Sequence, residues 1–313
     1  MSDFAFIFPG QGAQFIGMGK ELAEAFPAAK SVFEEVDEAL GQDLSGLMWA
    51  GELEDLTLTA NTQPALMAVS VAASRALEAE FGIAPKDAKF IAGHSLGEYS
   101  ALAAARAISI EETAKLLRTR GNAMQAAVAP GEGAMAALLG ATLEQAQAAC
   151  DVANGVCEVA NDNAPGQLVL SGAKNAIDEA CTHAKEIGVK KAVPLSVSAP
   201  FHCSLMQPAA DAMAEALAGA SIRSPETALV ANVSASAVSD PEIIRQNLVD
   251  QVTGRVRWTE SVQYMVANGI QRTGELGAGK VLTVMQRRIE KSLKGFTLGT
   301  PEQLEAFASE IKG

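Results

Sequence analysis

The chain has 313 residues, of which 49% are hydrophobic and 5% aromatic, and its formal net charge at neutral pH is −13. A chain of this size buries roughly 75% of its unfolded surface, enough for a large α/β domain with a smaller insert. The negative charge counts against nucleic acid or an anionic membrane as a partner. The first residues contain no basic signal-like segment, and no run of about 18 apolar residues follows, so we expect a cytoplasmic protein without a membrane span.

Strand and helix patterns alternate in the first part of the chain. A buried strand is predicted at 4–8, and a second one, built on Phe90, Ile91 and Ala92, at 90–92. The helical periodicity covers four further segments, at 20–40, 63–81, 96–107 and 110–128. This rhythm is typical of a parallel sheet covered by helices.

The Gly-His-Ser-Leu-Gly sequence at 93–97 lies between a predicted buried strand and an alanine-rich predicted helix. In this context the pattern is typical of a nucleophile elbow, a tight turn in which glycines remove Cβ atoms that would clash. The turn exposes the hydroxyl of Ser95 at the start of a helix, where free N–H groups and the helix dipole favour an oxyanion. We therefore expect Ser95 to be a nucleophile.

The pattern changes after residue 128. Strands are predicted at 134–139, 157–161, 167–171 and 190–196, and helices at 143–152 and 173–188, with a hairpin turn at 164–166. This β-α-β-β-α-β order is that of a ferredoxin-like unit. The α/β rhythm then returns, with helices at 203–217, 241–252, 259–268 and 281–293 and strands at 228–232 and 271–275.

These patterns predict a discontinuous catalytic domain, residues 1–128 and 200–313, with a hydrolase-like α/β fold, a parallel sheet and the elbow. A small ferredoxin-like domain, residues 129–199, would be inserted into it. The interface between two such domains is a common place for a ligand cleft.

A serine nucleophile needs a base, and the chain has 3 histidines. His94 lies inside the elbow, where its side chain is expected to point away along the turn, and His183 lies on a polar helix face. His202 follows Pro200 where the chain re-enters the larger domain, a position from which an imidazole can reach across a cleft. We favour His202 as the base; a helix-capping role for it, with His94 as the base, stays open.

Other motifs have simpler interpretations. The glycine-rich segment at 10–15 has Phe15 where a dinucleotide fingerprint requires a small residue, and the segment at 277–280 lacks the spacing of a phosphate loop. The four cysteines, Cys150, Cys157, Cys181 and Cys203, show no C-x-x-C spacing. Buried reduced thiols are therefore expected rather than a zinc site or disulfides, and no metal is expected.

Several separated motifs then fall in one recognisable order. They lie at 8–14, 93–98, 118–125, 161–172, 200–202, 251–258 and 275–282. In these motifs and their order the chain resembles the malonyl-CoA:acyl-carrier-protein transacylase family of type II fatty-acid synthesis, over essentially its whole length. The resemblance implies an acyltransferase whose partners are malonyl-CoA and acyl-carrier protein, with the coenzyme A thioester as a substrate and no cofactor.

The resemblance also implies roles for individual residues. Ser95 would attack the thioester carbonyl and carry the acyl group, while His202 would take and return the proton. The backbone N–H groups of Gln11 and Leu96 would form the oxyanion hole. Arg120 would pair with the malonyl carboxylate through a bidentate fork.

Further positions follow from the same resemblance. The backbone carbonyl of Gln251 would hold the distal nitrogen of the histidine, in place of an aspartate. Asn161 and Gln167 would lie in the small domain, where the family lines the cleft. Arg118 would face away from Arg120 and be a surface charge.

Two other function classes remain to be separated from acyl transfer. One is a serine esterase or thioesterase, which would have no use for a buried guanidinium at Arg120. The other is a non-catalytic protein that binds acyl carriers, against which Ser95 and His202 argue. Carrier docking on this acidic chain would need a local basic patch, and the candidates are Lys190 with Lys191 and the basic run from Arg287 to Lys294.

Overall fold

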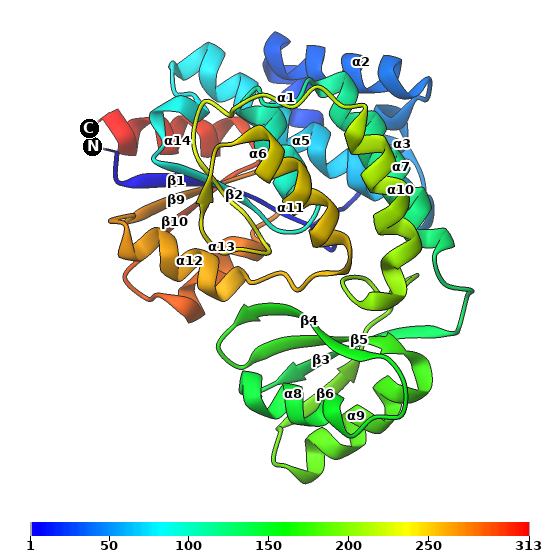
Figure 1. Cartoon of the computed structure of the whole chain (residues 1–313). Coiled ribbons are helices and arrows are strands. Elements are labelled where there is room, and N and C mark those ends of the chain that lie inside the picture. The colour runs from blue at the N-terminus through cyan, green and yellow to red at the C-terminus, as the bar shows by residue number, and fades with distance from the viewer. Residues whose placement is uncertain (1, 313) are drawn as a thin grey trace.

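A six-stranded sheet forms the larger of two bodies in the computed structural model, which describes residues 2–312 (Figure 1). Its strand order is β10-β9-β1-β2-β7-β8. The strands are β1 (Phe4–Phe8), β2 (Phe90–Gly93), β7 (Leu229–Val230), β8 (Ala237–Val238), β9 (Arg272–Leu276) and β10 (Lys294–Leu298). All neighbours pair in parallel except β7 and β8. The structure is therefore mixed α/β, with a parallel sheet as expected.

Every residue of β1 is buried, which shows that both faces of this sheet are covered. Phe4, Phe6 and Phe8 belong to the main apolar core, and the Phe6 ring lies 5.8 Å from the ring of Phe307. Ala5 and Ile7 point to the opposite face and join a second core. Successive side chains of a strand point to opposite faces, so this alternation makes β1 the centre of a layered body.

The helices of the larger body divide between these two faces (Figure 1). The second core packs on α12 (Trp258–Ala267) and α13 (Val281–Ile289). The other helices are α1 (Lys20–Ala25), α2 (Pro27–Leu40), α3 (Leu44–Ala50), α4 (Leu53–Thr57), α5 (Thr59–Phe81), α6 (Gly97–Ala104), α7 (Ile110–Ala126), α10 (Gln207–Ala218), α11 (Pro241–Thr253) and α14 (Pro301–Lys312). Among these, α5 is apolar on nearly all sides and buried along most of its length, so it forms the centre of the main core.

The smaller body is a four-stranded antiparallel sheet of order β4-β5-β3-β6 with two helices. Its elements are β3 (Gly133–Leu139), α8 (Leu143–Asp151), β4 (Cys157–Ala164), β5 (Gln167–Ala173), α9 (Lys174–Glu186) and β6 (Lys191–Pro194). Leu138 and Leu170 lie in the core shared with the two helices, whereas Met135 and Val169 belong to a separate cluster with Phe201 of the larger body. One face of this sheet is thus covered by its own helices, and the other turns toward the larger sheet.

Strand-like hydrogen bonds join the two bodies. Val256, just before α12, forms an isolated parallel bridge with Asn161 of β4. The N–H of Asp162 donates to the carbonyl of Val256 and the N–H of Val256 to that of Ala160, each over 2.9 Å. The Thr259 hydroxyl also donates to a carboxylate oxygen of Asp162 over 2.6 Å. These bonds hold β4 at a fixed place beside the larger body.

The structure corrects several sequence-based boundaries. The single helix expected at 20–40 is interrupted at Phe26, because Pro27 starts a new helix and cannot continue the one before it. Helices α3 and α4 were not expected; they are short and carry little periodic pattern. The helix expected at 281–293 ends at Ile289, and β8, β10 and α14 were missed.

Two expectations about composition can also be compared with the structure. All four cysteines are free thiols, but only Cys150 and Cys203 are buried; Cys157 and Cys181 are half-buried, so the expectation of burial is wrong for these two. None of the helices in residues 2–312 is long and apolar enough to cross a membrane.

Candidate active site

The elbow at the end of β2 is a strained turn. Ser95 has a φ of 53°, in the left-handed region that only a few non-glycine residues adopt. A Cβ at Gly93 would lie 1.9 Å from the backbone of Gly97, and one at Gly97 would lie 2.2 Å from the carbonyl oxygen of Phe8. Both glycines are therefore required for the turn to close against β1. This geometry places the hydroxyl of Ser95 at the first turn of α6, as the pattern predicts.

The loop that follows β1 lies beside the elbow. Phe8 pairs with Gly93 in the sheet register, and the N–H of His94 donates to the Phe8 carbonyl over 3.0 Å. The carboxyl ends of the two strands are thus adjacent, which brings Gln11 next to Ser95 and Leu96. Within residues 2–312, the backbone N–H groups of Gln11 and Leu96 make no hydrogen bond. Both donors are available to an oxyanion.

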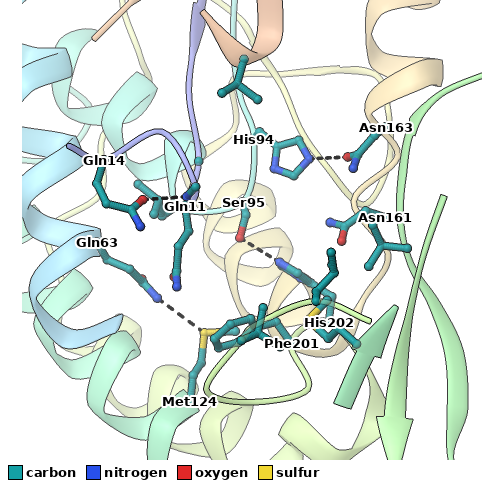
Figure 2. Close-up of a pocket in the computed structure, with 18 of the residues that line it drawn as sticks. Gln11, Gln14, Gln63, His94, Ser95, Met124, Asn161, Asn163, Phe201 and His202 are labelled. Atoms are coloured by element: carbon teal, nitrogen blue, oxygen red, sulfur yellow. Dashed lines mark hydrogen bonds between the residues drawn. The ribbon is translucent and has the colours of Figure 1, made fainter. Parts of the chain in front are cut away.

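Ser95 and His202 form a hydrogen-bonded pair, shown in Figure 2. Oγ of Ser95 lies 2.8 Å from Nε2 of His202, and Nδ1 of His202 donates to the backbone carbonyl of Gln251 over 2.8 Å. Because a carbonyl can only accept, the proton of the neutral ring sits on Nδ1 and leaves Nε2 as the acceptor for the serine hydroxyl. The pair has the geometry of a nucleophile and its base.

His202 reaches this position from a second strained backbone. Its φ is 59°, and it lies just before a short 3₁₀ helix, Ser204–Met206, that leads into α10. The side chain is buried, with 4% exposure. Burial, followed by the positive charge of Arg120, lowers the pKa of His202 to about 3. The ring is therefore neutral at physiological pH and able to accept a proton.

Arg120 of α7 brings a buried cation to the same point. It is 1% exposed, and its Nη2 donates to Oγ of Ser95 over 3.1 Å and to Oε1 of Gln251 over 2.8 Å. Nη1 donates to Oε1 of Gln63 over 2.9 Å. Nε has no partner within residues 2–312. Its hydrogen-bond acceptors in this part of the chain are neutral oxygens, so the guanidinium can still take an anionic partner.

A cavity of about 350 Å³ opens in front of these groups, between the two bodies. Gln11, Ser95, Arg120 and His202 line it from the larger body, and Asn161 from the smaller one. Apolar side chains, among them Phe201, form much of the remaining wall. A cleft with a few convergent polar groups in an apolar wall is typical of a small-molecule site.

His94 is turned away from the Ser95 hydroxyl, as expected from its place in the elbow. Nε2 of His94 bonds Oδ1 of Asn163 in β4 over 2.8 Å (Figure 2). The His94 ring also lies 5.7 Å from that of Trp258. Burial lowers the pKa of His94. His202, not His94, is therefore the histidine that contacts the serine in this structure.

The structure corrects two sequence expectations about site residues. Arg118 does face away from Arg120 and does not line the cavity, but it is half-buried rather than fully at the surface, and it donates to Asn61 over 2.7 Å and to Gln42 over 2.5 Å. It faces the α2–α3 loop because α7 packs against the α2 and α5 layer. Gln167 does not line the cavity; it accepts a hydrogen bond from Arg288 over 3.1 Å at the exposed end of the β4–β5 hairpin.

The sequence reasoning missed three polar residues that contact the site: Gln63, Glu98 and Asn232. All three are at most 1% exposed. Their signal in the sequence is a polar residue within an apolar run or directly after a buried strand, which by itself does not reveal a partner. Within residues 2–312, no group of three or more His, Cys, Asp or Glu side chains is arranged to hold a metal ion.

Comparisons with known proteins agree with this geometry. The family model described as acyl transferase domain matches residues 5–293. The chain is 44% identical to a malonyl CoA-acyl carrier protein transacylase of Bacillus subtilis over 100% of its length and 98% of that protein. A crystal structure of an acyl-carrier-protein S-malonyltransferase from Bartonella henselae matches with a TM-score of 0.97 and 52% identity, covering 100% of both chains. A malonyl-transacylase solved in complex with a type II PKS acyl-carrier protein matches with a TM-score of 0.95 and 40% identity, over 99% of this chain and 100% of that one.

Proposed function

Because the chain belongs to the acyl transferase family, we propose that it transfers the malonyl group from malonyl-CoA to the phosphopantetheine thiol of acyl-carrier protein. The transfer passes through a malonyl ester of Ser95, in a ping-pong sequence that supplies fatty-acid elongation. Relatives named for this activity, and one solved with a carrier protein, support the substrates and the partner. The coenzyme A thioester is a substrate, and the reaction needs no cofactor.

The observation that carries the choice of substrate is the placement of Arg120. A buried guanidinium is costly unless it is paired. The hydrogen-bond partners of Arg120 within residues 2–312 are neutral oxygens, and the buried carboxylate of Glu98 acts on it only through its charge. The guanidinium also lies 3.1 Å from the nucleophile, within reach of an acyl group held there. A substrate with a carboxylate at the far end of a short acyl chain satisfies this cation, as malonyl does.

The first half-reaction forms the acyl-enzyme. Nε2 of His202 takes the proton of the Ser95 hydroxyl as Oγ attacks the thioester carbonyl, and the free N–H groups of Gln11 and Leu96 bind the resulting oxyanion. When the tetrahedral intermediate collapses, the carbon–sulfur bond breaks and the imidazolium returns its proton to the departing thiolate. The products are malonyl-Ser95 and coenzyme A.

The second half-reaction reverses these steps with another thiol. His202 removes the proton from the phosphopantetheine thiol, and the thiolate attacks the ester carbonyl. The carbon–oxygen bond to Ser95 then breaks as the imidazolium returns its proton to the serine oxygen, which yields the malonyl thioester and the free hydroxyl. Gln251 keeps the imidazole in the required tautomer through its backbone carbonyl, so no aspartate is needed on the ring.

The substrate also tunes the base in this proposal. The charge of Arg120 is the second cause, after burial, of the low pKa of His202. A malonyl carboxylate paired with Arg120 offsets that charge and so raises the basicity of His202 when the correct acyl group is bound. An acetyl group gives no such compensation.

We also propose an assignment of the two bodies to known fold types. The elbow on a parallel sheet supports a hydrolase-like catalytic domain of residues 1–128 and 200–313, and the β-α-β-β-α-β order of β3 to β6 supports a ferredoxin-like small domain of residues 129–199. We also propose a cytoplasmic location, without a nucleic-acid or membrane partner.

A direct assay tests the proposal. Purified protein is mixed with malonyl-CoA and holo-acyl-carrier protein, and the malonylated carrier and free malonate are both quantified by mass spectrometry. The proposal requires carrier malonylation to exceed malonate release by a large factor. Predominant malonate release would instead identify a thioesterase, and turnover of neutral esters without malonyl transfer would identify an esterase.

A further inference from the structure

A carboxylate with no assigned role lies directly behind the site. Glu98, in the first turn of α6, is 0% exposed. Its Oε2 accepts from Nε2 of Gln251 over 2.7 Å and from the backbone N–H of Asn232 over 3.2 Å. Glu98 touches neither His202 nor the Ser95 hydroxyl by a hydrogen bond in the structure. Both of its partners do contact the site.

Gln251 is the residue that joins the base to the cation. Its backbone carbonyl holds Nδ1 of His202, and its side-chain Oε1 accepts from Arg120. Its Nε2 also donates to the carbonyl of Ser95 over 3.0 Å. Because a carboxylate oxygen only accepts, the side-chain amide of Gln251 must turn its nitrogen toward Glu98. Its oxygen then faces Arg120.

Asn232 fixes the backbone of the elbow. Its Oδ1 accepts from the N–H of Ser95 over 2.7 Å, and its Nδ2 donates to the carbonyl of Gly93 over 2.6 Å. These two bonds hold both sides of the strained turn. Oε2 of Glu98 accepts the backbone N–H of the same asparagine and also the side-chain amide of Gln251. One carboxylate oxygen is thus bonded to the residue that holds the elbow and to the residue that holds the base.

A second buried carboxylate, that of Glu275, has a purely structural role. Glu275, at the end of β9, is also 0% exposed and accepts the N–H groups of Leu282 and Thr283 over 3.0 and 2.7 Å. These bonds cap the first turn of α13, which is a common use of a buried acid. Leu282 lines the cavity, but the bonds of Glu275 reach neither Gln251 nor Asn232. Glu275 is therefore a matched comparison for the alignment of the base and the elbow.

We propose that Glu98 is a positioning residue of the site, whose buried carboxylate acts through Gln251 and Asn232 to align His202, Arg120 and the Ser95 backbone. Glu98 bonds the side chain of Gln251, whose backbone carbonyl in turn holds the histidine ring. Burial raises the pKa of Glu98 to about 7, so the carboxylate form is costly to keep at this place in the fold. The substrate readouts below rest on the proposed function.

Two substitutions separate the position of the acceptor from its charge. Glu98→Asp keeps the charge but withdraws the acceptor oxygen by one methylene, and Glu98→Gln keeps an oxygen within reach but removes the charge. Misplacement of reacting groups by about 1 Å can cost about a hundredfold in rate. We expect Glu98→Asp to lower the kcat of malonyl transfer about thirtyfold and the malonyl-to-acetyl ratio of kcat/KM about tenfold, and Glu98→Gln to lose only about threefold in each.

A fluorophosphonate that labels Ser95 provides a readout without malonyl. It needs only the aligned serine and base, so Glu98→Asp should slow labelling about tenfold and Glu98→Gln should largely rescue it. Glu275→Asp, the same shortening in the comparison residue, should lower the melting temperature without changing the labelling rate.

The outcomes distinguish this role from the proposed function. Wild-type protein that reacts with the fluorophosphonate but never with malonyl-CoA would overturn the proposed function, while labelling would still test Glu98. Wild-type labelling and selectivity in Glu98→Asp would overturn the positioning role. A larger loss in Glu98→Gln than in Glu98→Asp would also overturn it, since charge rather than position would then matter.

Discussion

Nη2 of Arg120 donates a hydrogen bond to Oγ of Ser95 over 3.1 Å, so the buried cation and the nucleophile lie together in the lining of the same cavity. In the free protein this bond satisfies one N–H of the guanidinium. A malonyl group esterified to Ser95 would extend its carboxylate toward the same guanidinium. We therefore expect Arg120 to distinguish an acyl group that ends in a carboxylate from one that ends in a methyl.

Arg120→Ala should change acyl selectivity rather than reactivity. Loss of a charge-assisted contact costs about 1.5–3 kcal/mol, or roughly ten- to a hundredfold in malonyl kcat/KM. Acetyl transfer should be unchanged or improved, because the charge that lowers the basicity of His202 is removed as well. Steady-state kinetics with both thioesters measure the ratio, and an equal loss for both would make Arg120 a structural residue.

His202→Ala should remove the base and leave the fold. Members of a nucleophile–base unit contribute non-additively, and loss of one costs about 10⁴-fold or more in kcat. The rate of malonyl-enzyme formation is measured by quenched-flow mass spectrometry, with circular dichroism as the check on folding. Near-normal malonylation would contradict the assignment and make His94 the next candidate.

The charge of Glu98 predicts a pH-dependent stability. Its pKa is raised from 4.5 to about 7 in the folded protein, so the fold binds this proton more tightly than the unfolded chain does. The contribution of Glu98 to the free energy of unfolding is then most favourable below pH 4.5. It is lost, by about 1.4 kcal/mol per pH unit, as the pH rises toward 7. The glutamine of Glu98→Gln does not titrate, so the variant does not lose this stability. The free energy of unfolding of the variant minus that of wild type should therefore increase from pH 5 to pH 8. Urea denaturation at both values checks this, and an equal difference at the two pH values would refute it.

Phe201 should restrict the α-carbon of the acyl group. It lines the cavity next to the base and packs against Met135 and Val169 of the small sheet, which limits its movement. A methyl branch would meet this ring, and steric rejection by a packed wall can exceed the roughly 1–3 kcal/mol that a missing methylene supplies. We expect a strong preference for malonyl-CoA over methylmalonyl-CoA, and a smaller ratio in Phe201→Ala. Comparable kcat/KM values for the two thioesters in wild type would exclude this role.

The sequence predicted the parts of this structure that depend on local rules. The elbow follows from two glycines around Ser95, and the small sheet from its strand and helix order. Such features are local because backbone sterics and side-chain periodicity decide them. The pairing of Ser95 with His202 came from elimination among three histidines together with the family resemblance.

Features that depend on distant partners were not predictable in this way. Glu98 reads as one acid in an alanine-rich helix, and only the fold brings Gln251 and Asn232 to it. The sequence predicts Arg118 to be a surface charge, but the packing of α7 leaves its side chain half-buried. The edge strand β10 is short and half-polar, so its pairing with β9 is set by the sheet rather than by its own pattern.

The central claim, that this chain carries malonyl on Ser95, is tested most directly by intact-mass spectrometry after incubation with malonyl-CoA alone. We expect one malonyl group to be gained, to be absent in Ser95→Ala with an unchanged fold, and to persist until a thiol acceptor such as holo-acyl-carrier protein removes it. Ser95 contacts His202 and Arg120 through its hydroxyl, so alanine removes the chemistry without removing packing. A wild-type protein that gains no mass, or a Ser95→Ala protein that gains the same malonyl group, would contradict the account.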